Sequence, residues 1–229
     1  MIVGSGLIAC AFAPINAQLE NVCIYAAGVS NSSCVDAHEF LREQQRLADV
    51  LSKFRQVDAF VYFSTCSIYD ADALSTPYVQ HKLAIELMVH THSRHMILRL
   101  PQIAGKTPNP HTLLNFLYAR ILRSESFNLW QKAKRNIIDI HDIVSITLQL
   151  LTNDVNRKIT INVANPVNYS MGEIVSAMEV VVGKRAIFEL IDRGTEYMID
   201  TSVMLPALAK SGVEFGESYL NRILTKYYK

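Results

Sequence analysis

Tyr78-Val79-Gln80-His81-Lys82 follows, after a short loop, the apolar run Ala59-Phe60-Val61-Tyr62-Phe63 and its polar end Ser64-Thr65-Cys66-Ser67. The apolar run predicts a buried strand, and Pro77 is favoured at the first position of the helix after it. Tyr78 and Lys82 are four residues apart, so they share one face of that helix. A lysine ammonium beside a phenol favours the phenolate. With a strand-end hydroxyl, the set predicts a proton relay for a carbonyl/alcohol couple.

Short apolar runs alternate with helical stretches along the rest of the chain. We expect strands at residues 1–3, 22–27, 59–64, 95–100, 159–163 and 186–190. We expect helices at residues 7–13, 36–54, 77–92, 111–123, 142–152, 170–182 and 218–228. The alternation predicts an α/β fold with a doubly wound, mostly parallel sheet. Residues 106–110 predict a loop that leaves this sheet.

Composition excludes some functional classes. The chain has 229 residues, of which 50% are hydrophobic and 19% charged, and its net charge is +1. This charge gives no electrostatic basis for binding nucleic acid or an acidic membrane, and no apolar run has the roughly 20 residues of a membrane span. The four cysteines have no metal-type spacing, which indicates free thiols in the cytoplasm. His90 and His92 do not share a helix face, so we expect no metal site.

Ordered segments of the sequence resemble the extended branch of the short-chain dehydrogenase/reductase superfamily, which contains nucleotide-sugar epimerases, dehydratases and reductases. Residues 1–9 resemble its glycine-rich first turn, and residues 25–28, 63–69 and 98–105 resemble its fourth, fifth and sixth strands. Residues 135–143, 161–164 and 169–171 resemble later elements of the family. The resemblance covers nearly the whole chain and implies a Rossmann-like core over residues 1–105, to which 136–165 return. Residues 106–135 and 166–229 would form a smaller, interleaved C-terminal part that binds the substrate.

The resemblance also implies roles for individual residues. Tyr78 would be the acid/base, Lys82 its activator and a contact of the nicotinamide ribose, and Thr65 the hydroxyl that holds the reacting oxygen. The implied substrate contacts are Ser67, Gln102 and Arg135, the last because an arginine is suited to a diphosphate. The implied NAD or NADP contacts are Gly4, Gly6, Leu7, Ile8, Ala26, Ala27, Gly28 and Lys82. Asp139 and Asp142 are expected to position a helix start.

The N-terminal half of the resembled fold is shortened. Glycines between a first strand and a helix let the backbone approach a pyrophosphate. Val3, however, occupies the place of the family's first glycine. Only the twelve residues 10–21 then separate Ala9 from the next strand, and twelve residues cannot hold a strand–helix–strand unit. The acid that normally binds the adenosine ribose therefore has no counterpart. We expect weak dinucleotide binding, and the sequence does not distinguish NAD from NADP.

Two functions follow as hypotheses. The first is an NAD(P)-dependent epimerase or keto-reductase acting on a nucleotide-linked sugar, for which the resemblance suggests a place in surface-polysaccharide synthesis. Dehydration is disfavoured, because Cys66 and Ser67 stand where dehydratases of the family have Asp-Glu. The alternative is a catalytically degenerate protein that binds a sugar nucleotide or a partner without turnover. The resemblance also leads us to expect a homodimer formed through helices 36–54 and 77–92.

Overall fold

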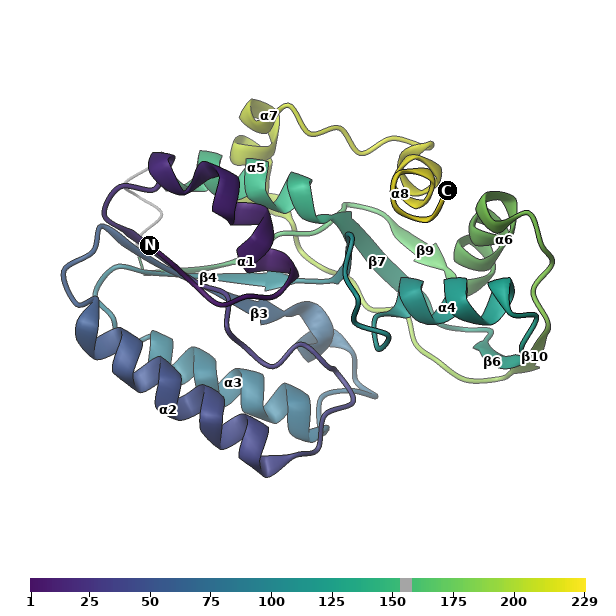
Figure 1. Ribbon diagram of the computed structural model, residues 1–229, viewed down its shortest axis with the longest axis horizontal. Coiled ribbons are helices and arrows are strands. Elements are labelled where there is room, and N and C mark those ends of the chain that lie inside the picture. Colours follow the sequence, from purple (N-terminus) through teal and green to yellow (C-terminus); the bar gives the residue numbers. More distant parts are fainter. Residues whose placement is uncertain (153–157) are drawn as a thin grey trace.

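The computed structural model of the protein describes residues 1–152 and 158–229 (Figure 1). Its main sheet has the strand order β1-β2-β3-β4-β8, and every neighbouring pair is parallel. The strands are β1 (Ile2–Val3), β2 (Val22–Tyr25), β3 (Ala59–Thr65), β4 (His95–Leu100) and β8 (Ile159–Asn162). The predicted parallel α/β sheet is confirmed.

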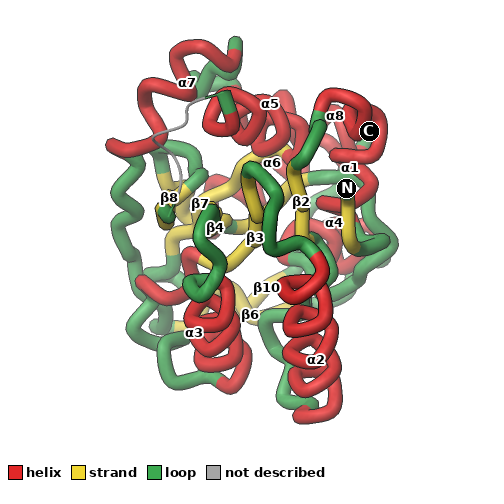
Figure 2. Tube along the Cα trace, turned by 90° about the vertical axis from the view of Figure 1, so that its left-hand side faces the viewer, coloured by secondary structure: helices red, strands yellow, loops and turns green. Residues whose placement is uncertain are grey.

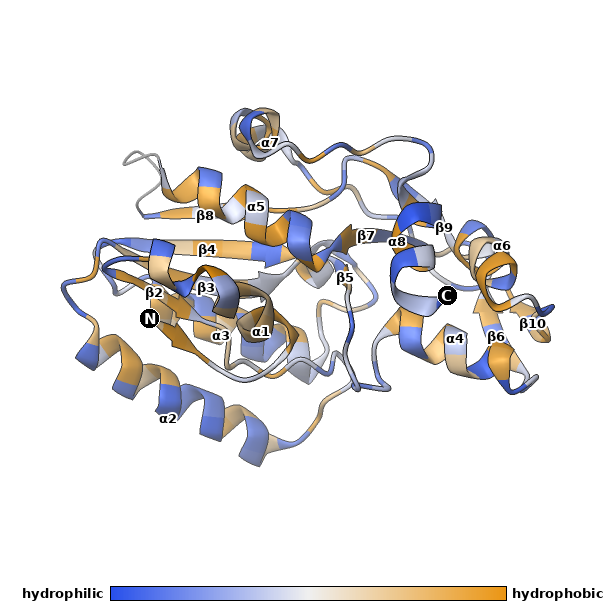
Figure 3. Ribbon diagram, turned by 45° about the horizontal axis from the view of Figure 1, so that its top comes forward, coloured by the Kyte–Doolittle hydropathy of each residue, from blue (hydrophilic) through white to orange (hydrophobic). Residues whose placement is uncertain are grey.

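Helices cover both faces of this sheet. Figure 2 shows α2 (Ala37–Lys53) and α3 (Pro77–Val89) below the strands, with α5 (Ile140–Leu151) above them. The short α1 (Leu7–Phe12) packs beside α5. All seven residues of β3 are buried, and alternate side chains enter different clusters: Phe60 and Tyr62 face α2 and α3, whereas Val61 and Phe63 join the α1 and α5 side. Figure 3 shows β4 as mostly hydrophobic, whereas α2 alternates in hydropathy.

The shortened N-terminal half has the form that the sequence predicts. After α1 the chain makes a 3-10 turn over Ala13–Gln18 and enters β2 directly. Strand β1 pairs only with β2, through Ile2 with Ile24 and Val3 with Tyr25. Among the described residues, no strand lies on the other side of β1. This edge is therefore open where the resembled fold has two further strands.

A smaller group of elements stands beside the main sheet. Strands β5 (Gln102–Ala104), β7 (Lys134–Asp139) and β9 (Asn168–Ser170) form one sheet, and β6 (Phe127–Trp130) pairs with β10 (Phe188–Ile191). Helices α4 (Leu113–Leu122), α6 (Met171–Val182) and α8 (Tyr219–Tyr228) share a second hydrophobic cluster with them. The sequence did not predict β5, β6, β7 or β9, because β5, β6 and β9 have only three or four residues and β7 begins with the polar residues Lys134, Arg135 and Asn136.

Side chains at the starts of several helices form the caps that their residue types favour. The side chain of Thr76 accepts a hydrogen bond from the Val79 N–H at the start of α3, and Ser170 forms a capping box with Glu173. Asp139 caps α5 by accepting from the His141 N–H, and the Tyr219 hydroxyl donates to Asp142 at 2.6 Å. These two aspartates therefore fix the helix start and attach α8, the structural role expected for them.

One element differs from the expected division of the chain. Helix α7 (Leu205–Ser211), absent from the predicted helices, packs on α5, and its Ala207 joins the core of the main sheet with Met204. Residues 166–229 are thus not confined to the smaller group, because the chain returns to the main sheet before it enters α8. No helix in residues 1–152 and 158–229 combines the length and apolar character needed to cross a bilayer.

Candidate active site

Thr65 and Tyr78 meet at the carboxyl end of β3. Thr65 is the last residue of the strand, Tyr78 is the second residue of α3, and both side chains are buried. The Thr65 hydroxyl lowers the pKa of Tyr78 and so opposes the effect of burial on the tyrosine. The Thr65 hydroxyl also donates to Ser67 Oγ at 3.0 Å and accepts from the Ser67 N–H at 3.1 Å. Three residues predicted for the site are therefore brought together.

Lys82 lies beside this pair but does not bond to it. Its Nζ donates to the Tyr62 hydroxyl at 3.1 Å and to Glu43 Oε1 at 3.5 Å, and it lies 5.8 Å from the centre of the Tyr78 ring. Burial raises the pKa of Tyr78 to about 12, although the Thr65 side chain opposes this effect. The lowered phenol pKa expected from the Tyr/Lys spacing is not found. The reason is that burial outweighs other effects and Glu43 balances the lysine charge.

Glu43 is the site residue that the sequence analysis missed. Its carboxylate is buried and accepts from the Val29 N–H at 2.7 Å, and His81 Nε2 lies 2.8 Å from it. Burial favours a raised pKa, but the His81 hydrogen bond and the Lys82 charge lower the pKa of Glu43 below its ordinary value. The sequence held a signal, because Glu43 precedes the buried Leu47 by four residues and therefore lies on the same inward face of α2.

Two glycines make room at the ends of β1 and β2. Gly4 has φ +131°, and a Cβ there would lie 2.3 Å from the carbonyl oxygen of Ala26. A Cβ on Gly28 would lie 2.7 Å from Lys82 Nζ. Gly4 requires glycine because its φ is positive and the blocking atoms are backbone, whereas at Gly28 the nearest atoms are the ends of flexible side chains. Gly6, at the start of α1, faces open space.

The other predicted cofactor contacts surround this turn. Leu7 and Ile8 turn their side chains into the main core, so a ligand at the turn would meet their backbone. Ala26 and Ala27 are half-buried and follow β2 directly. The residues predicted to hold a dinucleotide therefore lie at the carboxyl ends of β1 and β2, where Gly28 lies next to Lys82.

The predicted substrate residues Gln102 and Arg135 lie on neighbouring strands of the second sheet. Gln102 on β5 pairs with Ile137 of β7, two residues beyond Arg135. The Arg135 guanidinium donates to the carbonyl oxygen of Lys134 at 2.8 Å, and Arg135 is half-buried. Among the described residues, no hydrogen bond joins Gln102 or Arg135 to Thr65 or Tyr78.

The segment 192–200, which the sequence analysis did not single out, links these parts. Thr195 donates to Asp70 Oδ1 at 2.9 Å, so the segment is attached to the loop that follows Thr65. Burial raises the pKa of Tyr197 to about 12, and the Arg135 charge opposes this effect. The segment therefore passes between Arg135 and the loop after β3.

Metal ligands are not assembled in the described part of the chain. No group of three or more His, Cys, Asp or Glu side chains there is arranged to hold a metal ion. His90 and His95 contact each other, with Nδ1 and Nε2 3.0 Å apart. His92 Nε2 lies 2.9 Å from the carbonyl oxygen of Phe54. These contacts attach the C-terminal end of α3 to the start of β4 and to the residue that follows α2.

Comparison with known families identifies the chain. A sequence model described as the NAD dependent epimerase/dehydratase family matches residues 21–164. The chain belongs to this family. The matched region contains β2, β3, α3 and the Thr65–Tyr78–Lys82 set, but it begins after the Gly4–Gly6 turn. A search of curated proteins found no match to the sequence.

Solved structures of similar fold support the architecture. UDP-glucuronic acid 4-epimerase from Bacillus cereus, in complex with UDP-glucuronic acid and NAD, has a TM-score of 0.75 at 19% identity, covering 93% of this chain and 76% of that one. UDP-glucose 4-epimerase from Thermus thermophilus, in complex with NAD, has a TM-score of 0.71 at 15% identity, with coverages of 96% and 81%. RMD from Pseudomonas aeruginosa, complexed with NADPH, has a TM-score of 0.67 at 17% identity, with coverages of 91% and 82%. At these identities the likeness shows the fold.

Proposed function

We propose that this protein binds NAD or NADP and acts as an epimerase or keto-reductase on a nucleotide-linked sugar. The observation that carries the proposal is the grouping of buried Thr65 and Tyr78 at the carboxyl end of β3, beside a buried Lys82 that lies against Gly28. Ligands of open α/β sheets bind outside the carboxyl ends of the strands. A phenol and a hydroxyl that lie together at this edge of the sheet suit proton transfer to and from a sugar oxygen.

Each of the three residues has a distinct task in this proposal. Tyr78 gives a proton to, or takes one from, the sugar oxygen, and Thr65 holds that oxygen through its own hydroxyl. Lys82 binds the ribose next to the nicotinamide, because its ammonium lies against Gly28, where a ligand can approach the backbone. A bound NAD(P) supplies hydride acceptance and donation at the sugar carbon.

The residues present fit such a cofactor. Gly4 and Gly28 are both places where a side chain would collide with the surrounding atoms, and Gly6 opens to space at the start of α1. Backbone N–H groups at such a turn suit a diphosphate. Leu7, Ile8, Ala26 and Ala27 complete the proposed contact surface. NAD and NADPH in the similar structures support the choice of cofactor.

For the substrate we propose Ser67, Gln102 and Arg135 as contacts, with the smaller group of elements supplying most of the binding surface. The Arg135 guanidinium provides the charge for a nucleotide diphosphate. UDP-glucuronic acid in a structure of similar fold supports this substrate class. The four free cysteines suit a reducing compartment, and we propose a cytoplasmic location.

We also propose a homodimer formed by α2 and α3. These helices lie side by side on one face of the sheet (Figure 2). They expose Leu41, which is 51% accessible, and Leu87, which is 71% accessible. Exposed apolar residues on adjacent helices suit a helix-to-helix interface. Sedimentation velocity of the wild type and of Leu87→Glu tests this, and an unchanged dimer in the variant would exclude the interface.

Measurement of turnover tests the proposed enzymatic activity. Purified protein is incubated with NAD, NADP, NADH or NADPH and a panel of UDP-, GDP- and dTDP-sugars and their keto derivatives, and products are separated by chromatography. A changed sugar configuration without net cofactor reduction indicates epimerisation, and stoichiometric cofactor oxidation indicates reduction. Nucleotide-sugar binding without any turnover across the panel would favour the second candidate.

That second candidate is a protein that binds a sugar nucleotide or a partner without catalysis. Two observations favour it. The Lys82 ammonium is paired with Glu43 and Tyr62 rather than with Tyr78. Strand β1 is an open edge of only two residues. Calorimetry with dinucleotides and nucleotide sugars separates the candidates, because a non-catalytic protein of this kind binds the sugar nucleotide and no dinucleotide.

A further inference from the structure

A pocket of about 330 Å³ lies between the loop after β2 and helix α2. Residues 27–31 form one wall, and α2 forms the other through side chains that include Arg42, Glu43 and Arg46. This volume is at the small end of the roughly 300–1,000 Å³ of ligand pockets. The pocket therefore has room for one half of a dinucleotide rather than for the whole molecule.

The neighbours of the pocket identify which half fits. Gly4 packs against the carbonyl oxygen of Ala26, so the proposed diphosphate turn adjoins the pocket wall that begins at Ala27. Lys82 and Tyr78 do not line the pocket, and Gly28 and Glu43 stand between it and Lys82. A dinucleotide that places its nicotinamide ribose at Lys82 and its diphosphate at Gly4–Gly6 leaves its adenosine half for this pocket.

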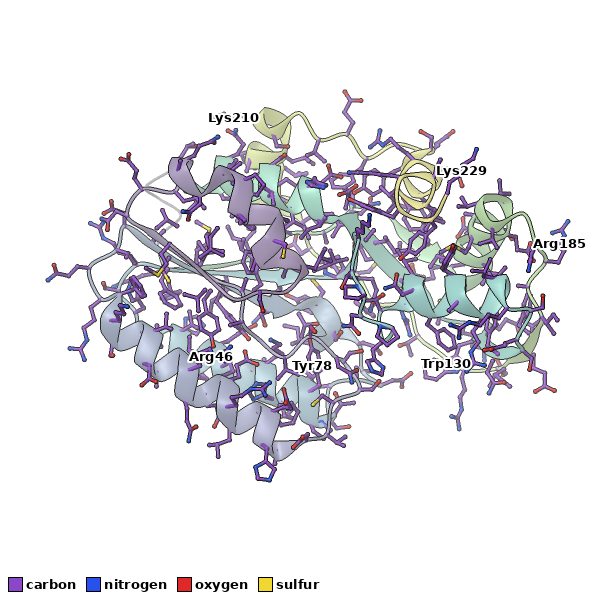
Figure 4. All side chains as sticks on the ribbon, in the orientation of Figure 1. Arg46, Tyr78, Trp130, Arg185, Lys210 and Lys229 are labelled. Atoms are coloured by element: carbon purple, nitrogen blue, oxygen red, sulfur yellow. The ribbon has the colours of Figure 1, made fainter. Side chains whose placement is uncertain are left out.

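The unpaired charge of the pocket is positive. Glu43 is already bound by the Val29 N–H, His81 and Lys82, and Glu39 forms an ion pair with Arg42. Among the described residues, no hydrogen bond or ion pair is found for Arg46. Figure 4 shows Arg46 on α2 and Tyr78 on α3, on the same lower side of the sheet. Arg46 is near enough to β2 for its charge to favour ionisation of Tyr25.

An arginine beside the adenosine ribose accommodates the 2′-phosphate of NADP, whereas an acid there selects the free hydroxyl of NAD. The strand that carries the usual ribose acid is missing from this chain, and the charge that remains beside the pocket is that of an arginine. We infer that the pocket between residues 27–31 and α2 binds the adenosine half of the cofactor and that Arg46 selects NADP through its 2′-phosphate. This inference rests on the proposed function, which by itself allows either cofactor.

Calorimetric titration of the full chain with NADP, NAD, 2′,5′-ADP and 5′-AMP tests it. A charge-assisted phosphate contact predicts roughly ten- to hundredfold tighter binding of NADP than of NAD, with the same order for the two fragments. Arg46→Gln should reduce NADP affinity to that for NAD and leave NAD unchanged. Arg55→Gln, the same charge change at an exposed arginine outside the pocket, should retain the wild-type preference.

Each other result has a defined meaning. Equal wild-type affinities for NAD and NADP, or an Arg46→Gln variant that keeps the preference, would overturn the inference and leave the proposed enzyme intact. A wild-type preference for NAD over NADP would likewise overturn the inference and leave the proposed enzyme intact. Binding of neither dinucleotide, with retained nucleotide-sugar binding, would overturn both the inference and the proposed redox function.

Discussion

The ammonium of Lys82 lies 3.5 Å from the carboxylate of Glu43, in a place where both side chains are almost completely buried. Burial lowers the pKa of Lys82, and the Glu43 charge opposes that change. This pair joins α2 to α3 next to Gly28, and the Glu43 charge raises the pKa of Tyr78. Glu43 therefore holds the position of the lysine that the proposed chemistry uses.

Removing the Glu43 charge should destabilise the protein. Breaking one side of a buried pair costs about 3 kcal/mol, so Glu43→Gln should lower the free energy of unfolding by about this amount near neutral pH. The pKa of Glu43 is lowered in the folded state. Its contribution is thus present above the unfolded pKa of about 4.3 and is lost as the pH falls through the folded value.

Urea unfolding between about pH 7 and about pH 2 measures this difference, which should shrink at the acid end. The double variant Glu43→Gln/Lys82→Met should recover part of the loss, because it leaves no unpaired buried charge. A single variant as stable as the wild type at neutral pH would show that the pair contributes little.

Tyr78→Phe should abolish turnover but preserve the fold and ligand binding. Loss of a positioned acid/base costs about 10²–10⁴-fold in rate. Tyr118→Phe removes a hydroxyl from a tyrosine of α4 whose ring packs against Tyr228, and it should remain fully active. The measurement is the initial rate on the substrate identified in the panel. Wild-type turnover in Tyr78→Phe would remove Tyr78 from the mechanism.

Ser64 and Thr65 carry adjacent hydroxyl groups, and we expect their removal to change the reaction rate to different extents. Ser64 Oγ is buried, and no hydrogen-bond partner is found for it among the described residues. Ser64→Ala should therefore leave the rate unchanged and be neutral or stabilising by about 1 kcal/mol. Thr65→Ala should lose much of the rate, because the Thr65 hydroxyl is proposed to hold the sugar oxygen and it lowers the pKa of Tyr78. Kinetics and thermal melting of the two variants test this contrast, and equal rate losses would contradict it.

Gly4 and Gly6 should respond differently to alanine. Gly4→Ala combines a strained φ with a collision at Ala26 and should cost about 2 kcal/mol or more in stability. Gly6→Ala adds a methyl group into open space, so the fold should remain stable while dinucleotide binding weakens. Urea unfolding and calorimetry separate the two effects. Unchanged dinucleotide affinity in Gly6→Ala would show that the turn does not hold the diphosphate.

Arg135→Ala should weaken nucleotide-sugar binding more than dinucleotide binding. A charge-assisted phosphate contact corresponds to a roughly ten- to hundredfold change in dissociation constant. Lys132→Ala removes a nearby positive charge that is exposed and paired with Asp192, and it serves as the control. Calorimetry with both ligand classes provides the readout. Equal losses for both ligands in Arg135→Ala would place the arginine outside the substrate site.

The sequence by itself determined the parallel sheet and the elements that carry Thr65, Tyr78 and Lys82. Continuous apolar runs, Pro77 and the cap at Thr76 are local signals, and they specify strands and helix starts without reference to distant residues. The count of twelve residues between Ala9 and β2 likewise fixed the shortened N-terminal half, because chain length limits which elements can be built.

Only the tertiary structure decided what surrounds Lys82. Glu43 is 39 residues away in the sequence, and only the packing of α2 on α3 brings it to the lysine. A spacing of four residues places Tyr78 and Lys82 on one face, but it does not specify which neighbour holds the ammonium. The pKa of Tyr78 therefore depends on burial and on Glu43, since ionisation responds to the three-dimensional distribution of charge and solvent, which local sequence does not contain.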